Sequence, residues 1–170
     1  MSSEPDQLLL SFAMSFASSP PQGVVTPLCQ SLADACQPFM AGDAAARLRL
    51  AAHELFENIV KYSQSGGCEL GFQLFRKASG AMRARVETRN VPAASHRADA
   101  EQRLAALCTA PDPLAHYDAI IADSAQRPAG SGLGLARIHA ETEYRLGYRF
   151  ENEALVIVAS GDVWLRGALP

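Results

Sequence analysis

AAHELFENIVKYS, residues 51–63, is the stretch of this 170-residue chain that decides its fold. Wound as an α-helix at about 3.6 residues per turn, it has two different sides. The apolar side is formed by Leu48 just upstream, Ala52, Leu55 and Ile59, with Phe56 and Val60 beside them. The other side carries Glu54, Asn58 and Lys61, next to Glu57. The apolar side predicts packing against a sheet, and the polar side is either a solvated surface or a binding site.

Helices and strands are expected on both sides of this stretch. Asp43 is a candidate N-cap for the helix, which should run from about Ala44 to about Tyr62. Residues 81–90, AMRARVETRN, alternate apolar and charged side chains, which predicts a strand with one face in water. Further strands are expected at residues 8–16, 68–77, 144–153 and 154–160, and further helices at residues 24–40, 95–108, 112–124 and 133–144.

Composition limits the classes of protein that this chain can belong to. Its length suits one well-filled core, so we expect a single domain over residues 1–170. The net charge of -3 gives no broad basic field for nucleic acid, and the four cysteines, which lack a Cys-x-x-Cys spacing, are expected to be free thiols. The apolar run at 8–16 is too short to span a bilayer and follows Glu4 and Asp6, where an export signal would be basic. We therefore expect a cytoplasmic protein that binds neither nucleic acid nor membranes.

A second informative stretch is RPAGSGLGLARI, residues 127–138, which places Gly130, Gly132 and Gly134 directly before an expected helix. Glycines at a helix N-terminus let backbone N–H groups approach phosphate oxygens without a Cβ in the way. The stretch lacks the Gly-Lys-Ser/Thr of a Walker loop, and no strand immediately precedes it as in a Rossmann fingerprint. Taken alone, such glycines more often form a tight turn than a phosphate site.

Together the two stretches resemble the GHKL ATPase superfamily. HELFENIVKYS looks like its N box, which implies a general base at Glu54, a Mg²⁺ ligand at Asn58, and nucleotide contacts from Lys61 and Tyr62. GSGLGLARI looks like its second glycine box, whose backbone closes over the triphosphate. The implied cofactor-binding residues in that box are Gly130, Ser131, Gly132, Leu133, Gly134 and Leu135. The resemblance also implies an α+β, two-layer α/β sandwich of the Bergerat type, with a mixed, mostly antiparallel sheet and helices on one face.

One part of the chain departs from the pattern of this superfamily. Its members normally carry Asp-x-Gly-x-Gly at the end of a strand, where the Asp accepts a hydrogen bond from the adenine amino group. This chain has ETRNVPAASH instead, and Asn90 lies closest to the position of that Asp. The Asn90 carbonyl can still accept a hydrogen bond, although the side chain is uncharged. Asn90 is therefore the candidate contact to the base.

The length of the chain narrows the resemblance further. A stand-alone domain of this size is most similar to the anti-sigma-factor serine kinases and to SiaB-like kinases, which phosphorylate a small STAS-type antagonist protein. The resemblance implies ATP and Mg²⁺ as cofactors, serine/threonine kinase activity, a lid at roughly residues 95–128, and a possible homodimer. Two alternatives remain: a degenerate module that regulates its partner by binding alone, with or without nucleotide, and an interaction protein whose glycine turn is purely structural.

Overall fold

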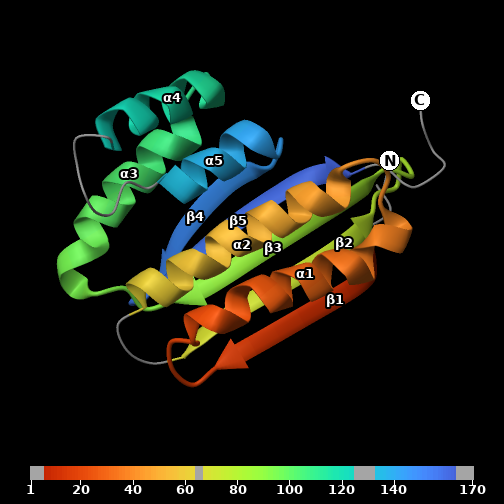
Figure 1. Cartoon of the computed structure of the whole chain (residues 1–170), viewed down its shortest axis with the longest axis horizontal. Coiled ribbons are helices and arrows are strands. Elements are labelled where there is room, and N and C mark those ends of the chain that lie inside the picture. Colours follow the sequence, from red (N-terminus) through yellow and green to blue (C-terminus); the bar gives the residue numbers. More distant parts are fainter. Residues whose placement is uncertain (1–5, 64–66, 125–132, 164–170) are drawn as a thin grey trace.

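The computed structural model describes residues 6–63, 67–124 and 133–163. Within them, five strands form one sheet in the order β1-β2-β3-β5-β4, and each neighbouring pair is antiparallel (Figure 1). The strands are β1 (Gln7–Phe16), β2 (Cys68–Arg76), β3 (Met82–Asn90), β4 (Arg145–Glu151) and β5 (Ala154–Val163). Strands β1 and β4 form the two edges of the sheet.

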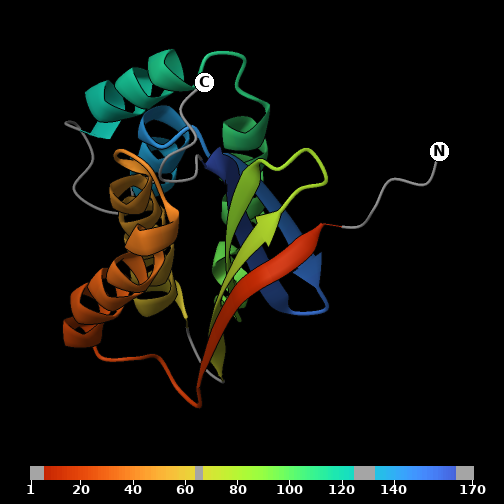
Figure 2. The same cartoon turned by 90° about the vertical axis from the view of Figure 1, so that its right-hand side faces the viewer.

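The helices cover one face of this sheet. They are α1 (Val25–Cys36), α2 (Ala44–Tyr62), α3 (Arg97–Thr109), α4 (Pro113–Ser124) and α5 (Leu133–Glu141). Helices α1 and α2 run side by side across the sheet, whereas α3, α4 and α5 gather toward the β4 side (Figure 1). Figure 2 shows the sheet edge-on, with its second face open. The structure is thus an α+β two-layer sandwich, which confirms the predicted fold class.

The apolar side of α2 forms the centre of the core, as its periodicity predicts. Leu48, Leu55 and Phe56 are fully buried, and Ile59 is 1% exposed. They join a cluster with inward-facing residues of the strands, such as Phe72. Burying a side chain of this size stabilises the fold by about 1.5–3 kcal/mol, so a few such residues outweigh any propensity of the helix itself.

Strand β3 also follows its sequence pattern. Met82, Ala84, Val86 and Thr88 are buried under the helices, while the alternate residues lie on the open face. Charges on that face pair within and between strands: Arg149 of β4 places Nε 2.7 Å from Oε1 of Glu151 on the same strand and Nη2 3.4 Å from Oε1 of Glu87 on β3. These exposed pairs contribute little to stability, because water screens them. One face of the sheet is therefore wet, as predicted.

The ends of two helices differ from the expectations. Asp43 occupies the N-cap position of α2, but its side chain makes no cap hydrogen bond, because its carboxylate accepts hydrogen bonds from Nε and Nη2 of Arg47 at 3.0 and 2.9 Å. Helix α5 ends at Glu141 rather than near residue 144, since Glu143 adopts a left-handed backbone with φ of 60°. Across the described parts of the chain, the structure contains no helix with the length and apolar character needed to span a membrane.

Candidate functional site

The side chain of Asn58 on α2 is oriented by the helix itself. The side-chain Nδ2 of Asn58 donates a hydrogen bond to the backbone carbonyl of Glu54, at 3.0 Å. Only the nitrogen of a carboxamide can donate to a carbonyl, so this bond fixes which way the amide points. Among the residues that the structure describes, no hydrogen bond engages Oδ1 of Asn58, an oxygen of the kind that hard cations prefer.

Lys61, one turn further along, is engaged differently. Its Nζ lies 2.5 Å from Oε2 of Glu57, an i,i+4 pair on the same helix. The hydrogen bond raises the pKa of Lys61 and lowers that of Glu57. A nucleotide phosphate would have to compete with Glu57 for this ammonium group.

Helix α5 brings the second motif directly against Glu54. Nη1 of Arg137 lies 3.4 Å from Oε1 of Glu54, a contact between residues 83 positions apart in the chain. Gly134 also lies against Glu54. A Cβ added to this glycine would lie only 2.2 Å from Oε2 of Glu54, so a larger residue would clash. The side chain of Glu54 is 16% exposed. The polar side of α2 and the glycine-loop helix therefore lie on the same side of the molecule and touch.

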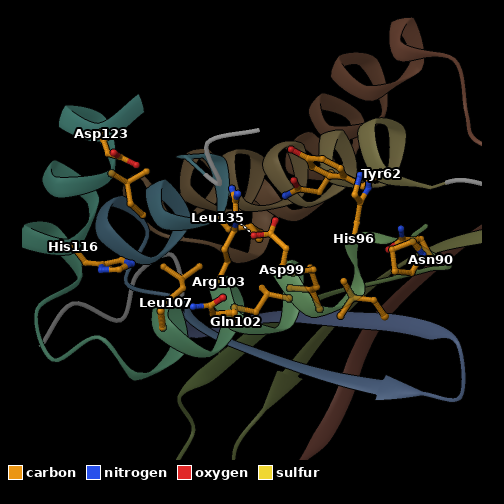
Figure 3. Close-up of a pocket in the computed structure, with 18 residues that line it drawn as sticks. Tyr62, Asn90, His96, Asp99, Gln102, Arg103, Leu107, His116, Asp123 and Leu135 are labelled. Carbon is orange, nitrogen blue, oxygen red and sulfur yellow. Dashed lines mark hydrogen bonds and ion pairs between the residues drawn. The ribbon is translucent and has the colours of Figure 1, made fainter. Parts of the chain in front are cut away.

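A cavity of about 620 Å³ opens beside this contact, between the helices and the ends of β3 and β5 (Figure 3). This volume lies in the ordinary range for small-molecule sites. Four of the residues predicted for the site line it: Asn58, Tyr62, Asn90 and Leu135. Four more described residues lie outside its lining: Glu54, Lys61, Leu133 and Gly134. Gly130, Ser131 and Gly132 fall outside the described residues.

Asn90 is the most informative group in the cavity wall. It is the last residue of β3, it is only 6% exposed, and it lines the cavity. Its amide atoms are not among the described side-chain atoms that are both buried and unpaired, namely Ser63 Oγ, His139 Nδ1 and the Tyr144 hydroxyl, so they stay accessible from the cavity. Figure 3 places Asn90 near Tyr62 and His96 at one end of the cavity. A ligand that offers both a donor and an acceptor at this end would satisfy both halves of the amide.

The remaining walls of the cavity come from segments that contain no recognisable sequence motif. Helix α3 and the residue before it contribute polar side chains, namely His96, Asp99, Gln102 and Arg103, and α4 contributes His116 and Asp123. Arg103 pairs with Asp99 one turn earlier, with Nε 2.9 Å from Oδ1. Apolar lining comes from Leu155 and Ile157 of β5, among others. The cavity thus combines an apolar floor with polar groups on several sides.

The donor set fits a magnesium–nucleotide complex better than a metal held by protein alone. The described residues contain no group of three His, Cys, Asp or Glu side chains placed to hold an ion. Mg²⁺ bound with nucleotides usually takes one or two protein oxygens and completes its shell with phosphates and water. The unpaired Oδ1 of Asn58 in the cavity wall meets that requirement.

No protein-family model matches the sequence, and no curated protein matches it either. Among solved structures, the fold is similar to a chain in the crystal structure of the SiaB-SiaC complex from Pseudomonas aeruginosa. The TM-score is 0.53 at 13% sequence identity, over 92% of this chain and 91% of that chain. Identity this low establishes a shared fold across nearly the whole length of both chains, and nothing finer.

Arg137 is the residue near the site that the motif comparison did not identify. It lies one turn after Gly134 on α5, and its guanidinium contacts both Glu54 and Glu141. The hydrogen bond to Glu141 raises the pKa of Arg137, so it carries a full positive charge beside Glu54. Winding residues 133–141 as a helix would have placed Arg137 on the same side as Gly134, but the sequence does not show that Glu54 lies opposite.

Proposed function

We propose that this protein is a GHKL-type signalling kinase that binds ATP with Mg²⁺ and phosphorylates a serine or threonine of a small STAS-type partner. The observation that carries the proposal is the meeting of α2 and α5, whose motifs are far apart in sequence, beside a single cavity of nucleotide size. The carboxamide of Asn90, which lines one end of that cavity, supports a ligand with a hydrogen-bonding edge.

The base and the phosphates would occupy opposite parts of the site. Leu155 and Ile157 would hold the adenine ring, and Asn90 and Tyr62 would meet its polar edge. Asn58 and the N-terminus of α5, which begins at Leu133, would meet the phosphates. A helix N-terminus favours an anion through its unpaired N–H groups and its dipole. Lys61 would bind the phosphates after breaking its ion pair with Glu57.

The residues of this chain divide the chemistry of transfer between them. Asn58 holds Mg²⁺, which neutralises phosphate charge when bound. Glu54 accepts the proton of the partner's hydroxyl as its oxygen forms a bond to the γ-phosphorus, and ADP leaves with the electrons of the broken bond. Positioning and charge neutralisation supply most of the acceleration in this class of reaction.

The partner assignment is supported by the fold similarity to a chain of the SiaB-SiaC complex, a two-protein assembly. Helices α3 and α4, which contribute cavity wall on the side away from α1, form the lid and part of the partner surface. The open sheet face and the edge strand β1 leave room for a second copy of the chain, so we also propose a homodimer.

A second candidate function is a module that regulates its partner by binding alone. It is favoured by the position of Glu54, which lies against Arg137 and outside the lining of the cavity. In that case nucleotide binds without phosphate transfer, and Asn58 rather than Glu54 controls the behaviour of the protein.

Calorimetry with ATP and ADP, with and without Mg²⁺, tests the nucleotide site. We expect binding that depends on Mg²⁺, weakened at least tenfold by Asn58→Ala because the cation loses its protein ligand. Arg49→Ala is the control: it removes an exposed polar side chain from the same helix, one that does not line the cavity. If millimolar ATP and ADP do not bind to the wild-type protein, the nucleotide function is wrong.

Phosphate transfer is measured with γ-labelled ATP and purified STAS-domain proteins from the same organism. Glu54→Ala should abolish labelling of the partner while nucleotide affinity stays within a few-fold, because Glu54 touches the hydroxyl and not the nucleotide. Binding of nucleotide and partner without labelling by the wild-type protein selects the binding-only module.

A further inference from the structure

The carboxylate of Glu54 occupies a defined seat on α5, formed by Gly134 and Arg137. Gly134 leaves the space in which the carboxylate lies, since a Cβ there would be 2.2 Å from Oε2 and 3.2 Å from Cδ of Glu54. Arg137, one turn later, places Nη1 3.4 Å from the other oxygen, Oε1. One carboxylate oxygen thus occupies the space that a side chain at position 134 would fill, and the other faces a cation. We call this pair of residues the carboxylate seat.

The space at Gly134 is explained by the contact with Glu54 rather than by the backbone. Gly134 lies within α5 and is not among the glycines with positive φ, so an L-residue could adopt its conformation. A glycine inside a helix is destabilising relative to alanine. Its presence here leaves room for Glu54, because the three atoms nearest the built Cβ are Oε2, Cδ and Cβ of Glu54.

Arg137 is held so that it can act on Glu54 from a fixed position. Its Nε lies 3.2 and 3.1 Å from the two carboxylate oxygens of Glu141, an i,i+4 pair on α5 that restrains the guanidinium. A second edge of the same planar group remains for Glu54. The side chain of Glu54 is largely shielded from solvent, which strengthens its interaction with the charge facing it.

We propose that Arg137 is a positioning residue for phosphate transfer, which keeps the Glu54 carboxylate aligned on α5. This inference rests on the proposed kinase function. Because α5 begins at the glycine loop, the seat links the position of the base to the position of the phosphate-binding backbone. Arg137 acts through Glu54 and makes no contact with nucleotide.

Steady-state kinetics separate this role from a nucleotide-binding one. Arg137→Gln should lower kcat about 10- to 100-fold, as expected for a base displaced by the order of 1 Å, and leave KM for ATP within about twofold. Arg137→Lys should recover part of kcat, since it restores a cation without the planar geometry. Arg47→Gln is the control: its guanidinium pairs with Asp43 and Glu143 and not with Glu54, so this variant should leave kcat within about threefold.

An unchanged kcat in Arg137→Gln would overturn the proposal. So would a rise in KM for ATP that accounts for the whole loss, because Arg137 would then bind phosphate directly. A failure of Arg137→Lys to recover any of kcat also counts against the role of charge.

A charge swap tests the contact without relying on activity. Arg137→Glu and Glu54→Arg each place like charges together, so each should lower the thermal unfolding midpoint. The double variant restores an opposite pair and should recover about 1–3 °C relative to the sum of the single changes. Lack of recovery overturns the contact. If the wild-type protein binds ATP without turnover, the kinase function fails while the swap still decides whether the seat exists.

Discussion

Replacing Gly134 with alanine tests the coupling between α2 and α5 most directly. The added methyl group would lie 2.2 Å from Oε2 of Glu54, whereas carbon and oxygen atoms in contact stay above about 3 Å. The carboxylate must therefore move by roughly 1 Å or more. It is the end of a flexible side chain, so rotation of Glu54 relieves the clash without moving the backbone of α2. The substitution thus displaces the candidate base while sparing the core.

The expected change in stability is limited because opposing contributions are similar in size. Alanine in place of glycine favours the helix by up to about 1 kcal/mol. Loss of the Glu54–Arg137 pair costs about 0.2–1 kcal/mol, given that Arg137 is 43% exposed. A strained rotamer of Glu54 costs about 0.5–1.5 kcal/mol more. The free energy of unfolding should therefore rise by no more than about 0.3 kcal/mol and fall by no more than about 2.5 kcal/mol.

The expected change in transfer rate is much larger. A displacement of about 1 Å at a catalytic group costs up to about 100-fold in rate. We would measure urea unfolding, ADP affinity and labelling of the partner, with Gly147→Ala as the control, because a Cβ at Gly147 in β4 meets nothing within 4 Å. A loss of more than about 3 kcal/mol of stability would show that Glu54 cannot move away. A normal transfer rate in a stable variant would refute the coupling.

Two further predictions concern packing and thiol chemistry. Gly161→Ala should lower the free energy of unfolding by about 1–3 kcal/mol. The added Cβ would lie 2.4 Å from a ring carbon of Tyr144, which is 2% exposed and cannot rotate away. Urea unfolding measures this change, and a variant as stable as the wild type would contradict the prediction. Burial raises the pKa of Cys29 to about 12, so at pH 8 a disulfide reagent should modify the partly exposed Cys108 first, and equal rates for both would be the opposite result. Because a thiolate is disfavoured in the fold, stability contributed by Cys29 is complete below pH 9 and declines as the pH rises toward 12.

The main elements could be predicted because their packing follows local periodicity. Helix α2 runs from Ala44 to Tyr62, the range expected from its apolar side and the break at SQSGG. Strand β3 was expected from strict alternation, and the open face of the sheet follows from the same pattern. In both elements one side is continuously buried, so the sequence period reports the tertiary environment directly.

The composition of the site could be predicted only in part, because it depends on contacts between distant segments. Helix α3 has just two buried residues, Leu104 and Leu107, so its pattern does not indicate which side meets the cavity. The pairing of Lys61 with Glu57, and of Arg137 with Glu54, involves choices among several neighbouring charges. Such choices depend on rotamers and on helix placement, which short motifs do not encode.

The amide at Asn90 has a physical consequence for the cavity wall. A carboxylate in a residue only 6% exposed would cost more free energy to desolvate than a carboxamide does. The carboxamide therefore lines the cavity at a smaller cost to the fold. Under the proposed function the same amide would offer the base a neutral hydrogen bond, whereas a charge-assisted one is roughly twice as strong. In that case Asn58 and the other phosphate contacts would have to supply most of the binding energy.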